Sequence, residues 1–181
     1  MHTFKVGVTA VVLSAALGMG GCAWVQGWFA PGAEAYVDVL AGTPRTAEDR
    51  ARDASRMTAQ TLAFSRVQPG DRVVDMIIGG GFFTRAFSAV VGPEGHVTAW
   101  QPGEFVAFQD SYGQTLRDMD ALDNVDGRLS PIAAPEWPSD VDLIFTAQNY
   151  HDLHLSNFPN DTARSVNAAA FAALKPGGHY V

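Results

Sequence analysis

The chain has 181 residues, of which 47% are hydrophobic, so it can bury a sizeable core within one domain and is not disordered as a whole. Its formal net charge is −7. Proteins that bind nucleic acid concentrate Lys and Arg on one face, and an acidic balance gives no electrostatic case for such a partner. We therefore exclude nucleic-acid binding.

The first 22 residues predict an export signal. Lys5 supplies a positive charge, residues 6–17 form an apolar run too short to span a bilayer, and small residues then lead to Cys22. The end of this segment, LGMGGC, resembles a bacterial lipobox, although Met19 stands where Leu is usual. We expect residues 1–22 to be a signal peptide with a lipobox and Cys22 to carry a lipid.

This anchor would place the exported protein on the periplasmic side of a bacterial membrane. Cys22 is the only cysteine of the chain, so no intramolecular disulfide can form. The alternative for Cys22 is a free thiol in an ordinary signal peptide. Residues 23–44 look like a tether, and the folded domain is expected over residues 45–181.

One helix of about 18 residues is expected from Thr46 onward, because apolar residues recur there at helical spacing. Thr46 with Asp49 three residues later is a loose capping-box pattern. The charged residues of this helix most simply form a solvated face. The alternative is that its arginines grip a ligand.

A strand, a glycine turn and a second helix are expected next. Residues 72–78 (RVVDMII) are rich in β-branched and apolar residues, as is typical of a buried parallel strand. Gly79, Gly80 and Gly81 follow at once, and residues 82–91 then have helical composition. Open α/β sheets bind ligands at such junctions, beyond the carboxyl ends of the strands. The alternative for the glycines is a tight turn that serves only close packing.

Two phosphate-binding patterns do not fit this turn. No Lys-Ser or Lys-Thr follows the glycines, which excludes the phosphate loop, and the dinucleotide pattern lacks its third glycine because residue 84 is Thr. What remains is an acidic residue followed by spaced glycines: Asp75, Gly79 and Gly81. This pattern is similar to the first motif of class I S-adenosylmethionine-dependent methyltransferases.

The resemblance extends along the chain. Residues 95–101 look like the second strand of that family, residues 141–147 like its fourth, and residues 174–178 (LKPGG) like the turn into its fifth. Residues 49–53, 61–64 and 149–152 are similar to an exported bacterial subgroup known mainly as predicted methyltransferases. The resemblance implies a three-layer, Rossmann-like α/β domain with a mostly parallel sheet, and S-adenosylmethionine as its cofactor.

The resemblance also implies cofactor-binding residues, namely Asp75, Gly79, Gly80, Gly81 and Gln101. Gln101 stands where the family has an acidic residue that hydrogen-bonds the ribose hydroxyls. Its carbonyl can accept a hydrogen bond but carries no charge, so we expect a weaker contact. Ile77 replaces the first glycine of the motif, and we expect the turn to open without a positive φ at this residue.

Catalysis by such a fold needs mainly positioning, because a methyl group on a sulfonium is already activated. A general base is needed only if the acceptor must lose a proton. Candidate groups follow the expected fourth strand: Asn149 and Tyr150 would orient the substrate, and His151, backed by Asp152, would act as base or polar lining. The alternative for His151 is a loop histidine that bonds the backbone. The histidines are too closely spaced to predict a metal site.

The predicted function is methyl transfer from S-adenosylmethionine to an unknown small-molecule acceptor. The alternative is a non-catalytic binding lipoprotein that retains the methyltransferase fold, and Ile77, Gln101 and the early end of the chain favour it. Because the chain ends at Val181, just after the expected start of strand five, we expect a domain truncated there, or one whose sheet a partner completes. A homo-oligomer would supply such a partner.

Overall fold

The computed structural model describes residues 31–181. The expected signal peptide, its lipobox with Cys22, and residues 23–30 of the expected tether lie outside the described residues. The elements in chain order are η2 (Ala33–Tyr36), α1 (Val37–Ala41), α2 (Ala47–Arg56), α3 (Thr58–Ser65), β1 (Arg72–Met76), α4 (Phe82–Val91), β2 (His96–Pro102), α5 (Gly103–Phe108), α6 (Asp110–Asp120), β3 (Val125–Ser130), β4 (Val141–Thr146), η3 (Tyr150–His154), α7 (Thr162–Ala173) and β5 (Leu174–Tyr180). Within residues 31–181, none of the helices combines the length and the apolar character needed to cross a bilayer.

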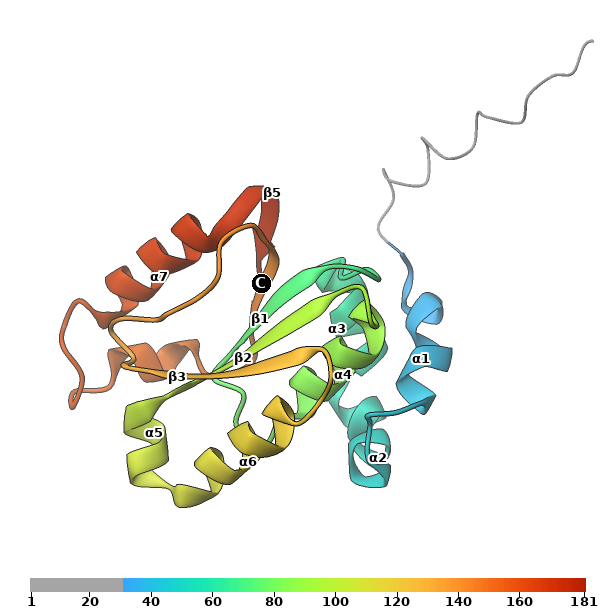
Figure 1. The fold of residues 1–181 in the computed structure, drawn as a ribbon, viewed down its shortest axis with the longest axis horizontal. Helices are drawn as coiled ribbons and strands as arrows, with labels where there is room; N and C mark the ends of the chain where they lie inside the picture. Colours follow the sequence, from blue (N-terminus) through green and yellow to red (C-terminus); the bar gives the residue numbers. More distant parts are fainter. Residues whose placement is uncertain (1–30) are drawn as a thin grey trace, which may run out of the picture. The chain divides into compact units, whose positions relative to one another are not determined.

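The sheet has the strand order β3-β2-β1-β4-β5, and each of its pairs is parallel. From β1 the chain moves outward to β3 and then returns to the other side of β1 to add β4 and β5. The strand order thus reverses between β1 and β4, and a doubly wound sheet binds its ligand at that switch point. Helices cover both faces of the sheet, as Figure 1 shows. The predicted α/β fold with a parallel sheet is confirmed.

Two apolar clusters fill the space between the sheet and its helices. The cluster on the α4 face includes Leu62, Phe83 and Phe87, and the cluster on the α7 face includes Trp100 and Val166. Side chains alternate along β1, so Val73 joins the first cluster and Val74 the second. By the same alternation Asp75 returns to the α4 face, where it meets Thr84 of α4.

The domain begins before residue 45, because part of the expected tether packs on it. Tyr36 is 3% exposed and Leu40 is 6% exposed, and both belong to the cluster on the α4 face. The hydroxyl of Tyr36 donates a hydrogen bond of 2.7 Å to the carbonyl of Val67. Residues 33–41 are therefore part of the folded domain.

The expected helix of about 18 residues is wrong, because two helices meet at Met57. The capping box is confirmed: the Thr46 side chain accepts from the Asp49 N–H, and the Asp49 carboxylate accepts from the Thr46 N–H. Met57 then adopts the left-handed conformation, with φ of 48°, and separates α2 from α3. The two helices have different contacts, since α2 buries the charged Asp49 and α3 buries the apolar Leu62.

The segment expected as a turn into strand five forms the irregular first part of β5. Leu174 pairs with Val141, whereas His179 pairs with Leu143, so the register shifts between them. Gly177 lies within this irregularity at a φ of 84°. Regular pairing with β4 resumes at His179 and continues to Val181, whose N–H donates to the carbonyl of Ile144.

Candidate functional site

The turn between β1 and α4 is open to solvent on one side and tightly packed on the other. Gly79 and Gly81 have φ values of 54° and 72°. A Cβ on Gly81 would lie 2.7 Å from Met119 Sδ, so this glycine is favoured by close packing as well as by its positive φ. A Cβ on Gly79 or Gly80 would meet nothing within 4 Å. The structural alternative therefore explains Gly81, whereas Gly79 leaves a bare stretch of backbone beside open space.

The expectation that Ile77 avoids a positive φ is wrong, because its φ is 60°. This conformation is unfavourable for a β-branched residue. Three hydrogen bonds hold it: the Ile77 N–H donates to the Trp100 carbonyl at 2.9 Å, and Asn149 Nδ2 donates to the carbonyls of Ile77 and Met76 at 2.8 and 3.2 Å. The turn thus keeps a left-handed opening without the first glycine of the motif.

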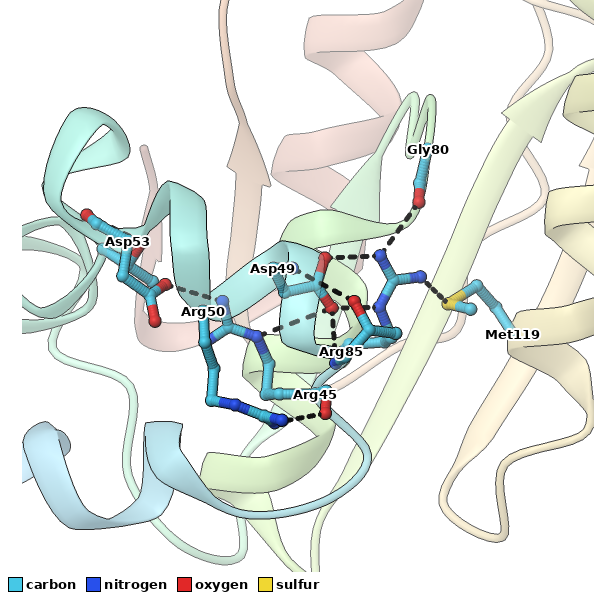
Figure 2. A network of polar contacts seen from close by, with 9 residues as sticks. Arg45, Asp49, Arg50, Asp53, Gly80, Arg85 and Met119 are labelled. Carbon is cyan, nitrogen blue, oxygen red and sulfur yellow. Dashed lines mark hydrogen bonds and ion pairs between the residues drawn. The ribbon is translucent and has the colours of Figure 1, made fainter.

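A buried ion-pair network supports the turn from α2, as Figure 2 shows. Arg85 Nε and Nη2 donate to the two carboxylate oxygens of Asp49 at 2.5 and 2.7 Å, and Nη2 also donates to the Gly80 carbonyl at 3.2 Å. Arg45 Nε lies 3.8 Å from the same carboxylate, and Arg45 Nη2 donates to Asp53 at 2.6 Å. The network therefore ties the glycine turn to the first turn of α2.

The expected solvated face is wrong at Asp49, which is 2% exposed. Burial by itself would raise the pKa of Asp49, but hydrogen bonds from Arg85 and Thr46 outweigh it and hold this pKa below its ordinary value. The carboxylate stays ionised at neutral pH. It can therefore keep both Arg45 and Arg85 in place.

A cavity of about 160 Å³, here called the turn cavity, lies against the open side of the glycine turn. Its charged lining residues are Asp75, Arg52 and Arg56, and the remaining ones are Ile77, Ile78, Gly79, Gly80, Phe82, Phe83, Ala147 and Asn149. The guanidinium carbons of Arg52 and Arg56 lie 5.1 and 5.4 Å from the centre of the Phe82 ring. Among residues 31–181, no ion pair involves either of these arginines.

Asp75 is the buried acid of this cavity. It is 4% exposed and accepts a hydrogen bond of 2.6 Å from the Thr84 hydroxyl. Burial raises the pKa of Asp75 to about 6, although hydrogen bonds from Thr84 partly oppose this rise. A perturbed acid in a cleft is typical of functional sites.

Gln101 lies beside the turn but uses its amide in an unexpected way. The side chain is fully buried, and its Oε1 accepts a hydrogen bond of 3.2 Å from the Gly79 N–H. The buried Nε2 has no hydrogen-bond partner among the described residues. One acceptor position of Oε1 is thus used by the turn, and the ribose contact expected of Gln101 stays a prediction.

The residues after β4 divide into two groups. Asn149 lines the turn cavity, and its Oδ1 accepts from the Thr146 hydroxyl. Tyr150, His151 and Asp152 lie on η3 and do not line this cavity. The Tyr150 hydroxyl accepts from Asn167 at 2.9 Å, and His151 Nε2 lies 3.2 Å from Asp152 with the histidine side chain 76% exposed. The roles of these three residues in a reaction stay predictions.

Sequence reasoning gave little weight to Arg52 and Arg56 and missed Thr84. The two arginines are four residues apart on α2, so they share one face of the helix. Their spacing of four residues was the feature of the sequence that could have indicated a shared site. Among residues 31–181, no group of three or more His, Cys, Asp or Glu is placed to hold a metal ion.

No family model matches the chain, and no curated protein matches its sequence. Solved structures do match. An S-adenosylmethionine-dependent methyltransferase from Aquifex aeolicus is 25% identical, with a TM-score of 0.50, and the match covers 70% of this chain and 65% of that protein. Aeropyrum pernix fibrillarin with natively bound S-adenosyl-L-methionine is 21% identical, with a TM-score of 0.46 and coverages of 63% and 45%.

PKMT2 from Rickettsia typhi, in complex with AdoHcy, is 17% identical, with a TM-score of 0.44 and coverages of 61% and 20%. The chain therefore spans less than two thirds of the length of each of these three proteins. The five-stranded parallel sheet with its helices matches the Aquifex protein, and the fold is the Rossmann-like fold of methyltransferases.

We expect Asp75→Asn to remove a pH dependence of stability. The folded-state pKa of about 6 lies above the ordinary value of 3.8, so the folded state keeps this proton longer than the unfolded state does. The stability that the proton contributes is complete below about pH 4 and is lost as the pH rises to about 6, a total of roughly 2–3 kcal/mol. Urea denaturation of the unchanged protein and of Asp75→Asn between about pH 4 and pH 7 measures this loss of stability. A difference in stability that is the same at every pH would contradict the assignment.

Asp49→Asn should destabilise the domain by about 3 kcal/mol, because it leaves the buried Arg45 and the half-buried Arg85 without their shared carboxylate. Asp53→Asn is the matched control: Asp53 pairs with the same Arg45, but its side chain is 26% exposed. An asparagine at this position keeps a side-chain oxygen that can accept from Arg45, and the Asp49 carboxylate remains beside the guanidinium, so we expect a smaller loss of about 1–2 kcal/mol. Thermal and urea unfolding compare the two variants. Equal losses would show that the network in Figure 2 does not depend on Asp49.

Proposed function

We propose that the chain binds S-adenosylmethionine at the glycine turn and transfers its methyl group to a small-molecule acceptor. The observation that carries this proposal is the turn cavity, whose lining includes the buried Asp75, Arg52 and Arg56 beside bare backbone. One carboxylate and two guanidiniums complement the ammonium and the carboxylate of an amino acid. The similarity to the Aquifex methyltransferase supports the choice of ligand.

The amino-acid end of the cofactor fits the turn cavity in charge and in size. Asp75 would accept from the ammonium, and Arg52 would pair with the carboxylate. A cavity of about 160 Å³ suits this end alone, because sites for larger ligands start near about 300 Å³. The adenosine would lie across Gly79, on the side of Gln101. There Gln101 would act through the turn, because its Oε1 holds the Gly79 N–H and so positions the backbone against which the ribose would lie.

When bound, the cofactor supplies an activated methyl group on a sulfonium. The residues of this chain supply positioning, which accounts for most of the acceleration such a reaction needs. With a pKa of about 6, Asp75 is largely ionised at neutral pH, and an ammonium beside it favours the ionised form further. The proposal keeps the exported, lipid-anchored location that the amino-terminal sequence predicts.

Isothermal titration of the full chain should show micromolar binding of S-adenosylmethionine and of S-adenosylhomocysteine. The analogue 5′-methylthioadenosine lacks the amino-acid part, and we expect it to bind at least about tenfold more weakly because it cannot meet Asp75 and Arg52. Equal affinity for the analogue would contradict recognition by the turn cavity. No binding of either S-adenosyl compound would refute the proposal and leave the non-catalytic alternative.

Gly79→Ala should weaken cofactor binding by at least about tenfold, because the new Cβ occupies the open side of the turn. The matched control is Gly70→Ala. Gly70 also has a positive φ, 88°, and open space around its Cβ, but it precedes β1 and does not line the turn cavity. Both variants carry the strain of about 1 kcal/mol that a side chain meets at positive φ. Thermal unfolding should therefore show similar losses of stability for the two variants. Titration with the cofactor should show weakened binding only for Gly79→Ala. Similar affinities for both variants would remove Gly79 from the site.

A further inference from the structure

A second cavity, here called the side cavity, adjoins the turn cavity. It encloses about 410 Å³, which falls in the range of small-molecule sites. Arg56, Phe83 and Ala147 line both cavities, so the two meet along these residues. A ligand in the side cavity would thus reach the place where the amino-acid end of the proposed cofactor lies.

The walls of the side cavity are partly aromatic and include one charged side chain. Phe83 and Phe145 form the aromatic part, with ring centres 4.8 Å apart. Among the side chains that line it in the described part of the chain, that of Arg56 is the only charged one. The complementary ligand is therefore a small apolar or aromatic molecule with one negative group.

The same lining lacks a general base. None of its described residues is His, Asp, Glu, Lys or Tyr. An alcohol, a phenol or an ammonium group must lose a proton when it is methylated, whereas a carboxylate is already ionised at neutral pH. A carboxylate also has two oxygens, so one can pair with a guanidinium while the other reacts.

We propose that the side cavity binds a small apolar or aromatic carboxylic acid as the methyl acceptor, an inference that rests on the proposed function. A carboxylate oxygen forms a bond to the methyl carbon, the bond from that carbon to sulfur breaks, and its electron pair stays on sulfur. The products are a methyl ester and S-adenosylhomocysteine, and no proton moves. Negative and positive charge cancel in this step, which an apolar wall favours.

The test compares phenylacetate with phenylacetamide, which has the same shape but no charge. Titration of the full chain without cofactor should show phenylacetate binding at least about tenfold more tightly. Thr61 lines the side cavity but not the turn cavity, so Thr61→Phe fills the former alone. Thr61→Phe and Arg56→Met should each weaken phenylacetate binding by about tenfold or more. The matched control is Arg164→Met, because Arg164 is an exposed arginine of α7 that lines neither cavity. This control should change phenylacetate binding by less than about twofold.

With methyl-labelled S-adenosylmethionine, the chain should form labelled methyl phenylacetate, which releases methanol in base. Equal binding of acid and amide, or acid binding that neither variant weakens, would overturn the assignment. So would bound acid and bound cofactor that yield no ester. Failure of the proposed function is distinguishable, because S-adenosylmethionine would then not bind at all. The acid titration needs no cofactor and would still decide what the side cavity holds.

Discussion

The backbone between β1 and α4 is held in a conformation that its own sequence resists, and the rest of the site depends on it. A β-branched residue at positive φ costs of order 1–3 kcal/mol and persists only where its surroundings fix it. Here the Trp100 carbonyl of β2 and the Asn149 amide after β4 fix Ile77, while Arg85 of α4, held by Asp49 of α2, fixes Gly80. Four elements thus converge on one turn, and they bring Asp75 and Arg52 to the same cavity.

Two buried aspartates show how differently this domain treats the same side chain. Asp49 has cationic partners that outweigh the effect of burial, and its pKa is lowered. Asp75 has only the hydrogen bonds of Thr84, and burial raises its pKa to about 6. The first arrangement stabilises the fold. The second leaves a buried acid and nearby arginines without mutual neutralisation, which is typical of a site that recognises a charged ligand.

Sequence patterns predicted those parts of the fold that depend only on neighbouring residues. The β-branched run of β1 and the glycines after it were recognisable because strand propensity and backbone freedom belong to neighbouring residues. The pairing of Asp49 with Arg85 joins residues that are 36 positions apart in the sequence, and no pattern in either helix predicts it. Asn149 and His151 were predicted together, yet only Asn149 lines the turn cavity, because a loop sequence does not determine which side chains face inward.

The break at Met57 was the least predictable feature and has the largest consequence for the proposed acceptor. Met57 has a good helix propensity, so the periodic pattern ran through it unbroken. The break ends α2 at Arg56 and starts α3 at Thr58, and Ser55, Arg56, Met57 and Thr61 all line the side cavity. The sheet supplies Phe145 and Thr146 to the same cavity, but its charged side chain comes from the end of α2. If the proposals hold, the sheet and glycine turn position the methyl donor, and the helical segment before them selects the acceptor.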